Sequence, residues 1–298
     1  MKTGKIIKQA IIGYPAGIVA GVTYGLNPLF AMPLIAAGAA IGFILFFRYS
    51  FAVALLGLYL VVTRQSFRVS GRQALILLVL GLLYTCSSLF LFEAYNYIAS
   101  GLATTLVFLY PVLVAIIMVF LGVVPSWPVW LSIAATFFGV VVMTRSDSAQ
   151  AMDTTGIILS ICSALAYALF IVIINRSKVI KQISNTLLTF YTLVVGVVVF
   201  IALVSLRGEP LTPDIGGAEV WINLLCLAVL PTIVSTATLA VSTRNIGATK
   251  ASVMGVFEPI TAILVGAVAF GEPLTANIVT GMLISVAAVT FMILLTKR

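Results

Sequence analysis

Apolar residues run through this chain in ten long blocks, which short polar connections separate. Each block approaches the roughly 20 apolar residues that a helix needs to cross a membrane. The blocks predict transmembrane helices at residues 10–32, 38–62, 73–95, 100–122, 127–144, 154–175, 185–206, 219–242, 248–270 and 274–296. The clearest polar linkers are 145–155 and 207–219. We therefore expect an all-α membrane protein with ten transmembrane helices.

The second half of the sequence repeats landmarks of the first half at a constant offset of 148 residues (259 − 111). The matched pairs are Pro111 and Pro259, Pro125 and Pro273, and Asn27 and Asn175. We infer two related halves, 1–148 and 149–298, with five predicted helices each. Because five is odd, the second half must enter the membrane from the opposite side. This predicts two inverted-topology five-helix repeats, a design that recurs in secondary transporters.

Composition excludes an ordinary soluble protein, since 62% of the residues are hydrophobic and 8% are charged. Soluble domains carry about 25% charged residues. Of the 16 Lys and Arg residues, Arg48 lies within a span, Arg145 and Arg207 fall on one side, and the others fall on the opposite side. Cytoplasmic loops are the basic ones, so we expect both termini in the cytoplasm and a multi-pass protein of the cell membrane. The net charge of +8 is then no sign of nucleic-acid binding.

One carboxylate lies deep within a predicted span. Glu258 follows the start of its helix by about ten residues, or about 15 Å, which is near the middle of the hydrocarbon core. Tyr110 is its repeat partner at similar depth, and the helix-breaking Pro111 and Pro259 follow these two residues. Polar groups at broken helices near the midplane are typical of transporter binding sites. Either Glu258 binds substrate or a proton, or it hydrogen-bonds to a neighbouring helix.

Three further charges are candidates for the substrate pathway. Arg48 and Glu93 both lie within predicted spans, where an ion pair between them would lower the cost of each charge. Alternatively, Arg48 meets a carboxylate or phosphate of a substrate. Lys250 opens a span on the basic side, where it is either an interfacial anchor or an anion contact.

Uncharged polar residues and glycines complete the candidate pathway. Asn27 and Asn175 close two predicted helices at matched positions and either cap helix ends or touch substrate. Tyr84 belongs to a group of tyrosines that either line a cavity or simply pack; the others are Tyr14, Tyr24, Tyr95, Tyr97 and Tyr167. Glycines recur every fourth residue at Gly13, Gly17, Gly21 and Gly25, a pattern that favours close helix contact.

The sequence lacks the residue patterns of an enzyme. It contains no histidine, and its three cysteines have no metal-ligand spacing. The phosphate-binding pattern GxxxxGK[ST] is absent, which argues against ATP-driven transport by this chain. We expect no enzymatic activity, no metal and no cofactor.

The chain resembles the EamA family of the drug/metabolite transporter superfamily over nearly its full length. The resemblance rests on the duplicated five-helix unit, on Phe46-Phe47-Arg48, on the join at 94–100 and on the string from Glu258 to Thr275. Val124 departs from the pattern, because it replaces the acid of the family's Gly-Glu turn. The resemblance implies a ten-helix secondary carrier, often an exporter of amino acids or other small metabolites, with a central cavity between the halves.

Three functions are compatible with these features. The favoured one is a secondary active transporter, an exporter or exchanger of amino acids or other small metabolites that works by alternating access in the lipid bilayer. Proton coupling through Glu258 or Glu93 is an open alternative within it. The second is a carrier of larger anions such as a sugar phosphate, a nucleotide sugar or a lipid-linked headgroup. The third is a non-transporting membrane scaffold, which a solid core with Glu258 fully paired would favour. The sequence specifies no oligomeric state.

Overall fold

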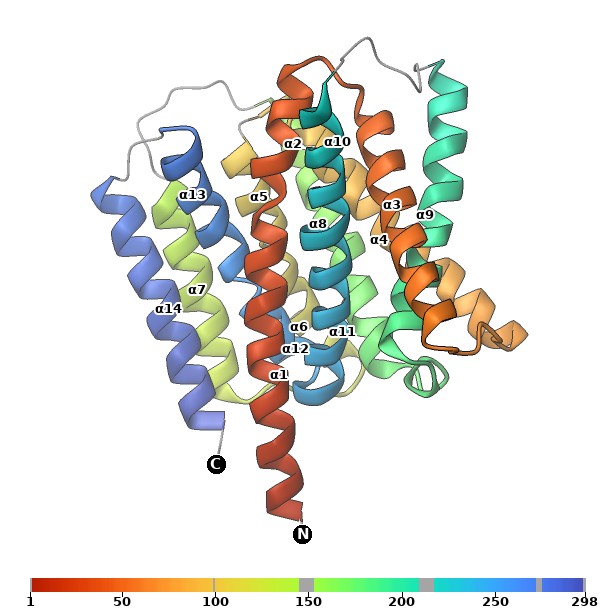
Figure 1. Cartoon of the computed structure of the whole chain (residues 1–298). Coiled ribbons are helices and arrows are strands. Elements are labelled where there is room, and N and C mark those ends of the chain that lie inside the picture. Colours follow the sequence, from red (N-terminus) through yellow and green to blue (C-terminus); the bar gives the residue numbers. More distant parts are fainter. Residues whose placement is uncertain (1, 99, 145–152, 209–216, 272–274, 297–298) are drawn as a thin grey trace.

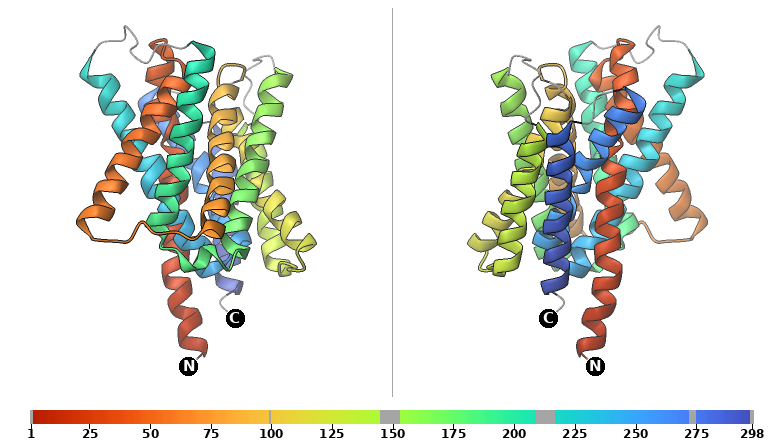
Figure 2. Two further views of the ribbon diagram at one scale, coloured as in Figure 1. Left: turned by 90° about the vertical axis from the view of Figure 1, so that its right-hand side faces the viewer. Right: turned by 90° about the vertical axis from the view of Figure 1, so that its left-hand side faces the viewer.

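The computed structural model describes residues 2–98, 100–144, 153–208, 217–271 and 275–296, and it contains helices but no β-strand in these ranges. The helices form one bundle, with the first turn of α1 and the last turn of α14 at the same end (Figure 1; Figure 2). The predicted boundary between the halves, residues 148 and 149, lies outside the described residues, and so does Pro273. The predicted all-α class is confirmed for the described residues.

The helices follow the predicted blocks in order. In the first half they are α1 (Lys2–Gly25), α2 (Asn27–Ala36), α3 (Ile41–Val62), α4 (Gly71–Ala94), α5 (Ser100–Val107), α6 (Tyr110–Phe120) and α7 (Trp127–Thr144). In the second half they are α8 (Thr154–Arg176), the 3-10 helix η1 (Ile180–Gln182), α9 (Asn185–Arg207), α10 (Ala218–Leu227), the π-helix η2 (Ala228–Val234), α11 (Ser235–Ile246), α12 (Ala248–Met254), α13 (Phe257–Ala269) and α14 (Ala276–Thr296).

Within the described residues, seven helical stretches are long and apolar enough to cross a membrane. They are Gln9–Ala36, Ile41–Val62, Gly71–Ala94, Thr154–Arg176, Asn185–Arg207, Ala218–Ile246 and Ala248–Ala269. The other three predicted spans contain shorter apolar helices, Tyr110–Phe120, Trp127–Gly139 and Val279–Ala288. The chain is therefore a multi-pass membrane protein.

Polar side chains cap the first turns of α4, α8 and α9, which begin within two residues of the predicted starts of these spans. The Ser70 hydroxyl accepts a hydrogen bond from the Gln73 amide, and the Gln73 side chain accepts one from the Ser70 amide, so the two residues form a capping box before α4. The Asp153 carboxylate caps α8 by accepting from the Thr155 amide at 2.7 Å. Ser184 caps α9 in the same way. These caps satisfy amides that have no partner within the helix.

Four predicted spans are interrupted rather than continuous, because each carries a proline within it. Pro28, Pro111 and Pro259 stand in the first turns of α2, α6 and α13, where a missing backbone N–H costs nothing. Pro231 lies inside η2, where the helix widens to π geometry. A proline that continued the preceding helix would clash with the carbonyl four residues earlier. The chain therefore starts a new helical segment at or near each of these four prolines, whereas Pro15 and Pro33 lie inside α1 and α2.

Helix packing follows the 148-residue offset. That offset relates α1 to α8 and α4 to the stretch from α10 to α11. Accordingly, α1 packs on α11 as α8 packs on α4, while α3 packs on α9 and α7 on α14 (Figure 1). The contact of α1 with α11 thus has its repeat counterpart in the contact of α8 with α4, as expected of two related halves.

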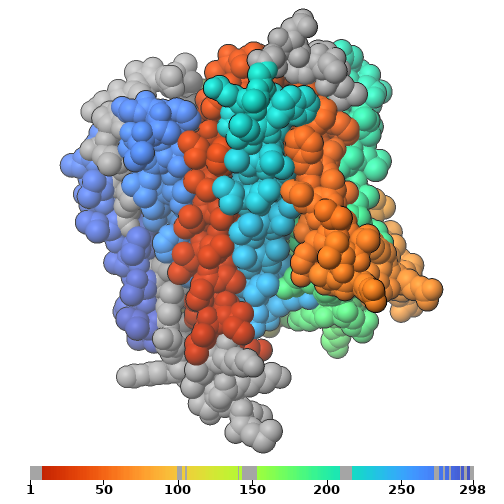
Figure 3. Space-filling view, viewed as in Figure 1, coloured from red at the N-terminus to blue at the C-terminus, as the bar shows by residue number. Residues whose placement is uncertain are grey.

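The glycine stripe of α1 allows the helix to approach its neighbours closely. A Cβ at Gly13 would lie 2.5 Å from Ile246 Cγ2, and one at Gly25 would lie 2.5 Å from the Glu258 carbonyl oxygen. In space-filling view, α1 fills the seam between α13 and the α10–α11 stretch (Figure 3). The glycine stripe therefore lies where α1 contacts its neighbours, and Gly25 packs against the backbone at Glu258.

Candidate functional site

The two broken spans meet at a buried hydrogen bond. Tyr110 is the first residue of α6, and Glu258 is the second residue of α13. The Tyr110 hydroxyl donates to Glu258 Oε1 at 3.1 Å, between residues exactly one repeat offset of 148 apart. Tyr110 is 0% exposed and Glu258 is 4% exposed. This is the only hydrogen bond that the described residues give to the Glu258 carboxyl, so its second oxygen is not used by the fold.

Gly255 makes this contact possible. It lies just after α12, and a Cβ there would stand 1.5 Å from the Tyr110 hydroxyl oxygen and 2.7 Å from the ring carbon that bears it. No side chain fits at Gly255 while Tyr110 keeps its position. The sequence gives no sign of this contact, because nothing in it shows which side chain faces Gly255.

Gly255→Ala is expected to reduce the free energy of unfolding by about 1–3 kcal/mol, the usual cost of overpacking. Thermal unfolding of the detergent-purified protein measures this effect. Gly71→Ala is the matched control, since a Cβ at Gly71 would meet no atom within 4 Å. Adding Tyr110→Phe should recover part of the loss, because the hydroxyl is the closest atom. A wild-type Tm for Gly255→Ala would contradict the close approach.

An aromatic cluster extends from this hydrogen bond through the bundle. Its members come from five helices: Tyr24, Tyr49, Tyr84, Tyr110, Tyr167 and Phe170. The rings of Tyr110 and Tyr167 pack in a T-shaped arrangement, with 4.8 Å between their centroids. The Phe170 ring stacks on that of Tyr167, with 6.2 Å between the ring centroids, and its centroid lies 5.2 Å from that of Tyr84. The Tyr84 ring in turn stacks on that of Tyr49, with 6.0 Å between the centroids. All six side chains are buried.

Arg48 contacts the aromatic cluster at Tyr49, whereas Glu258 contacts it at Tyr110. Its side chain is 0% exposed, and its guanidinium carbon lies 5.5 Å from the Phe92 ring centroid and 5.9 Å from that of Tyr49. Nε donates to the Thr232 hydroxyl, and Nη2 donates to the Pro231 carbonyl at 3.4 Å. Nη1 has no hydrogen-bond partner among the described residues.

The acceptors of Arg48 belong to the π-helix. The Thr232 hydroxyl donates to the Leu227 carbonyl at 2.7 Å, five residues earlier, so it fills a gap in the backbone ladder beside Pro231. On the next turn, the Thr236 hydroxyl donates to the Tyr84 hydroxyl at 2.9 Å. Thr232 and Thr236 were not predicted as site residues, and the visible signal was Pro231 within an apolar span.

Glu93 does not pair with Arg48, so the ion pair, one of the alternatives for these two charges, is wrong. Glu93 lies in the last turn of α4 and binds Arg207, in the last turn of α9. The side chains are 17% and 43% exposed, so this pair lies at the edge of the bundle. The sequence shows that Glu93 lies within a span. It does not show which cation of another helix lies beside it, and in the structure this is Arg207. Arg48 consequently has no carboxylate partner among the described side chains.

The predicted asparagines contact main-chain carbonyls. At the break between α1 and α2, Asn27 Nδ2 donates to the Tyr24 carbonyl at 2.9 Å, while its Oδ1 is buried without a partner. Asn175 Nδ2, near the end of α8, donates to the Thr243 carbonyl at 3.2 Å. Both contacts are of the kind that helix capping requires. Lys250 is half-buried on α12, away from any described hydrogen-bond or ion-pair partner.

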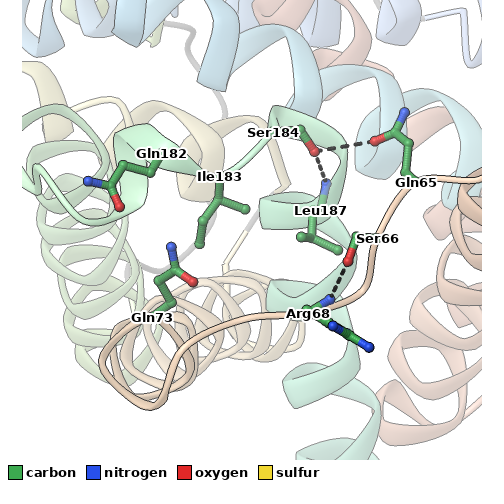
Figure 4. Close-up of a pocket in the computed structure, with 8 residues that line it drawn as sticks. All are labelled: Gln65, Ser66, Arg68, Gln73, Gln182, Ile183, Ser184 and Leu187. Carbon is green, nitrogen blue, oxygen red and sulfur yellow. Dashed lines mark hydrogen bonds between the residues drawn. The ribbon is translucent and has the colours of Figure 1, made fainter.

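A separate polar groove of about 320 Å³ lies at the connection between α3 and α4, beside the start of α9. Its lining residues are Gln65, Ser66, Arg68, Gln73, Gln182, Ile183, Ser184 and Leu187 (Figure 4). The Ser184 hydroxyl donates to Gln65 across it at 3.5 Å. None of the predicted site residues lines this groove, so it is distinct from the Tyr110–Glu258 contact and from Arg48.

A similar curated protein, an "Uncharacterized transporter" of Archaeoglobus fulgidus, is 31% identical over 139 residues, which are 44% of this chain and 48% of that protein. The match thus spans about half the length of that relative.

A solved structure titled "Crystal structure of protein" shares the fold, with a TM-score of 0.77 at 17% identity over 96% of this chain and 99% of that one. The model of the EamA-like transporter family matches twice, at residues 11–145 and 154–294. These two matches cover most of the chain and confirm the duplication and the resemblance. The chain belongs to the EamA-like transporter family.

Proposed function

We propose that this protein is a secondary active transporter that exports or exchanges amino acids or other small metabolites by alternating access across the cell membrane. In this proposal the chain crosses the bilayer ten times, as two inverted five-helix repeats divided near residues 148 and 149. Both termini lie in the cytoplasm. The substrate pathway passes Glu258, Tyr110, Arg48 and Tyr84, with Asn27, Asn175, Lys250 and Glu93 nearer its ends, and Pro111 and Pro259 break its helices.

The arrangement of the helices supports the inverted repeat. The α1 helix begins at the end of the bundle where α14 ends, whereas α8 begins at the opposite end (Figure 1). Equivalent helices of the two halves therefore run in opposite directions. An arrangement in which α7 packs on α14 and α3 on α9 is what a two-fold axis in the membrane plane produces. The basic residues on one side support cytoplasmic termini.

The hydrogen bond between Tyr110 and Glu258 carries the functional proposal. It joins the broken helices of both halves at repeat-equivalent positions, so relative movement of the halves would break it. A carboxylate deep in the bilayer is expensive, whereas a carboxylic acid is much less so. Proton uptake at Glu258 would therefore make the same contact sensitive to the proton gradient. Glu93 is the weaker coupling candidate, because it is paired at the edge of the bundle.

Counterflow in proteoliposomes tests transport itself. Vesicles that contain the purified protein are loaded with an unlabelled amino-acid pool and diluted into a trace of the radiolabelled pool. We expect the trace to accumulate transiently above its equilibrium level, because a carrier exchanges substrate across the membrane while a leak does not. Protein-free vesicles are the control.

A second loading with glycerol 3-phosphate and UDP-glucose tests the alternative of larger anions. Counterflow of these compounds alone would overturn the amino-acid assignment and favour that alternative. The absence of counterflow for every pool would favour the scaffold. The polar contacts argue against the scaffold, because Glu258 has one hydrogen bond and Arg48 has an unpartnered nitrogen within the described structure.

A further inference from the structure

The guanidinium of Arg48 is a buried positive charge without an anion. Arg48 and Glu258 are the charged residues that are buried in the described part of the chain. An arginine remains protonated in proteins. Its neighbours in the fold are two aromatic rings, the hydroxyls of Thr232 and Tyr84 and the Pro231 carbonyl, none of which carries a negative charge. The fold thus leaves the charge uncompensated and one of its donors, Nη1, unused.

A buried charge without a partner is costly. Desolvation of an ion in a protein interior costs several kcal/mol, and only an opposite charge with good hydrogen bonds offsets this cost. Contacts with aromatic faces recover part of it, about 2 kcal/mol at most for a desolvated cation. The site around Arg48 therefore favours an anion that can accept a hydrogen bond from Nη1.

The two halves differ from each other at this site. The repeat position of Arg48 in α9 is Gly196 (196 − 48 = 148), where a Cβ would lie 2.2 Å from the Tyr49 ring. The repeat position of Pro231 is Leu83 (231 − 83 = 148), which lies in the regular helix α4. Both departures from the repeat meet where Arg48 contacts Pro231 and Thr232. Packing of two equivalent halves requires neither an arginine opposite a glycine nor a proline opposite a leucine at these repeat positions.

The surroundings also limit the kind of anion. Arg48 is the sole buried cation among the described residues. The site therefore suits a ligand with one negative charge better than a ligand with two. The aromatic cluster that begins at Tyr49 suits an uncharged or apolar remainder of the ligand. A carboxylate accepts a strong, charge-assisted hydrogen bond from a guanidinium nitrogen such as Nη1.

We propose that Arg48 holds a carboxylate of the ligand through its unpartnered Nη1, with Thr232 fixing the guanidinium from the other side. The ligand class is a small monocarboxylate, zwitterions included. The assignment rests on the proposed transport function and names the chemical group that the substrate must carry. It places the carboxylate beside Arg48 and Tyr49, whereas Glu258 is bound by Tyr110.

Thermal unfolding of the purified protein with small probes tests this assignment. The probes are acetate, L-lactate, glycine and L-leucine, each as the sodium salt or free zwitterion. Their matched controls are acetamide, L-lactamide, glycinamide and L-leucinamide, which keep the size but lack the carboxylate. At saturation we expect at least one carboxylate to raise the Tm of the wild type by about 2–4 °C, with no rise for its amide.

Variants locate the effect at Arg48. Arg48→Met should lose the carboxylate-dependent rise, and Arg48→Lys should keep a smaller one, because lysine is charged but lacks the planar fork. Arg207→Met is the matched control and should respond like the wild type, since Arg207 is paired at the edge of the bundle.

Three results would overturn the assignment: no rise with any carboxylate, an equal rise with the amides, or an undiminished rise in Arg48→Met. A larger rise with sodium phosphate than with every carboxylate would overturn the ligand class. Counterflow separates this assignment from the transport function. Counterflow that does not distinguish carboxylates from amides leaves the transporter intact and overturns the role of Arg48. A carboxylate-dependent Tm rise without counterflow supports the role of Arg48 and contradicts transport.

Discussion

In proteoliposomes, Glu258→Gln is expected to abolish the response of amino-acid uptake to an imposed pH gradient. Glutamine has nearly the same shape and can still accept the hydrogen bond from Tyr110, but it cannot take up or release a proton. We expect the gradient-driven initial rate to fall at least about tenfold, which corresponds to about 1.4 kcal/mol. The measurement compares uptake of the radiolabelled pool with and without the gradient.

Two variants separate proton coupling from general damage. Tyr110→Phe removes the donor but keeps the carboxyl, so uptake should still respond to the gradient. The thermal stability of Glu258→Gln should stay at or above that of the wild type, because a neutral amide replaces a buried acid. A gradient response that survives in Glu258→Gln would exclude Glu258 as the coupling acid while leaving the carrier in place.

Arg48→Met is expected to raise the free energy of unfolding of the ligand-free protein by about 1–4 kcal/mol. Replacing a buried ion pair by apolar side chains of similar volume is often neutral or stabilising by this amount, and an unpaired charge lacks even the attraction that such a pair gains. The effect should be marked here because the guanidinium has no carboxylate partner among the described residues. Thermal unfolding in detergent, without added carboxylates, measures the change.

The sign of this change separates two roles of Arg48. If the contacts to Thr232 and to the aromatic rings made Arg48 a net contributor to the fold, Arg48→Met would lower the Tm. A stabilised variant that no longer responds to carboxylates would instead show that the charge is retained for ligand binding at the expense of stability. Thr232→Val is the companion variant. It should weaken the response to carboxylates without removing it, because it frees the guanidinium from its hydroxyl acceptor.

The sequence was sufficient to predict the class of fold and the duplication. Membrane spans are determined by length and hydropathy, which are local properties of the chain. Seven predicted spans are found as long apolar helices, and the family model matches each half separately. The offset of 148 residues also identified Tyr110 and Glu258 as equivalent positions before their contact was known.

The helix breaks were predictable in kind but not in detail. Pro111 and Pro259 were expected to interrupt their helices, and both stand in the first turn of a new one. The widening at Pro231 to a π-helix was not predicted, because the same proline could equally have kinked or ended the helix. Which outcome occurs depends on what satisfies the freed backbone groups, and here the Thr232 hydroxyl takes part.

The partners of the polar groups were decided only by the tertiary structure. Sequence position gives the depth of a residue along its span, but the rotation of each helix about its axis comes from packing against its neighbours. For this reason the sequence suggested Arg48 as an ion-pair partner of Glu93, whereas in the structure Glu93 pairs with Arg207. For the same reason Thr232 and Gly255 were missed, since each matters only through the side chain that faces it. The sequence alone determined that a few charges are buried in a membrane bundle, and the packing of its helices decided which of them remain available to a ligand.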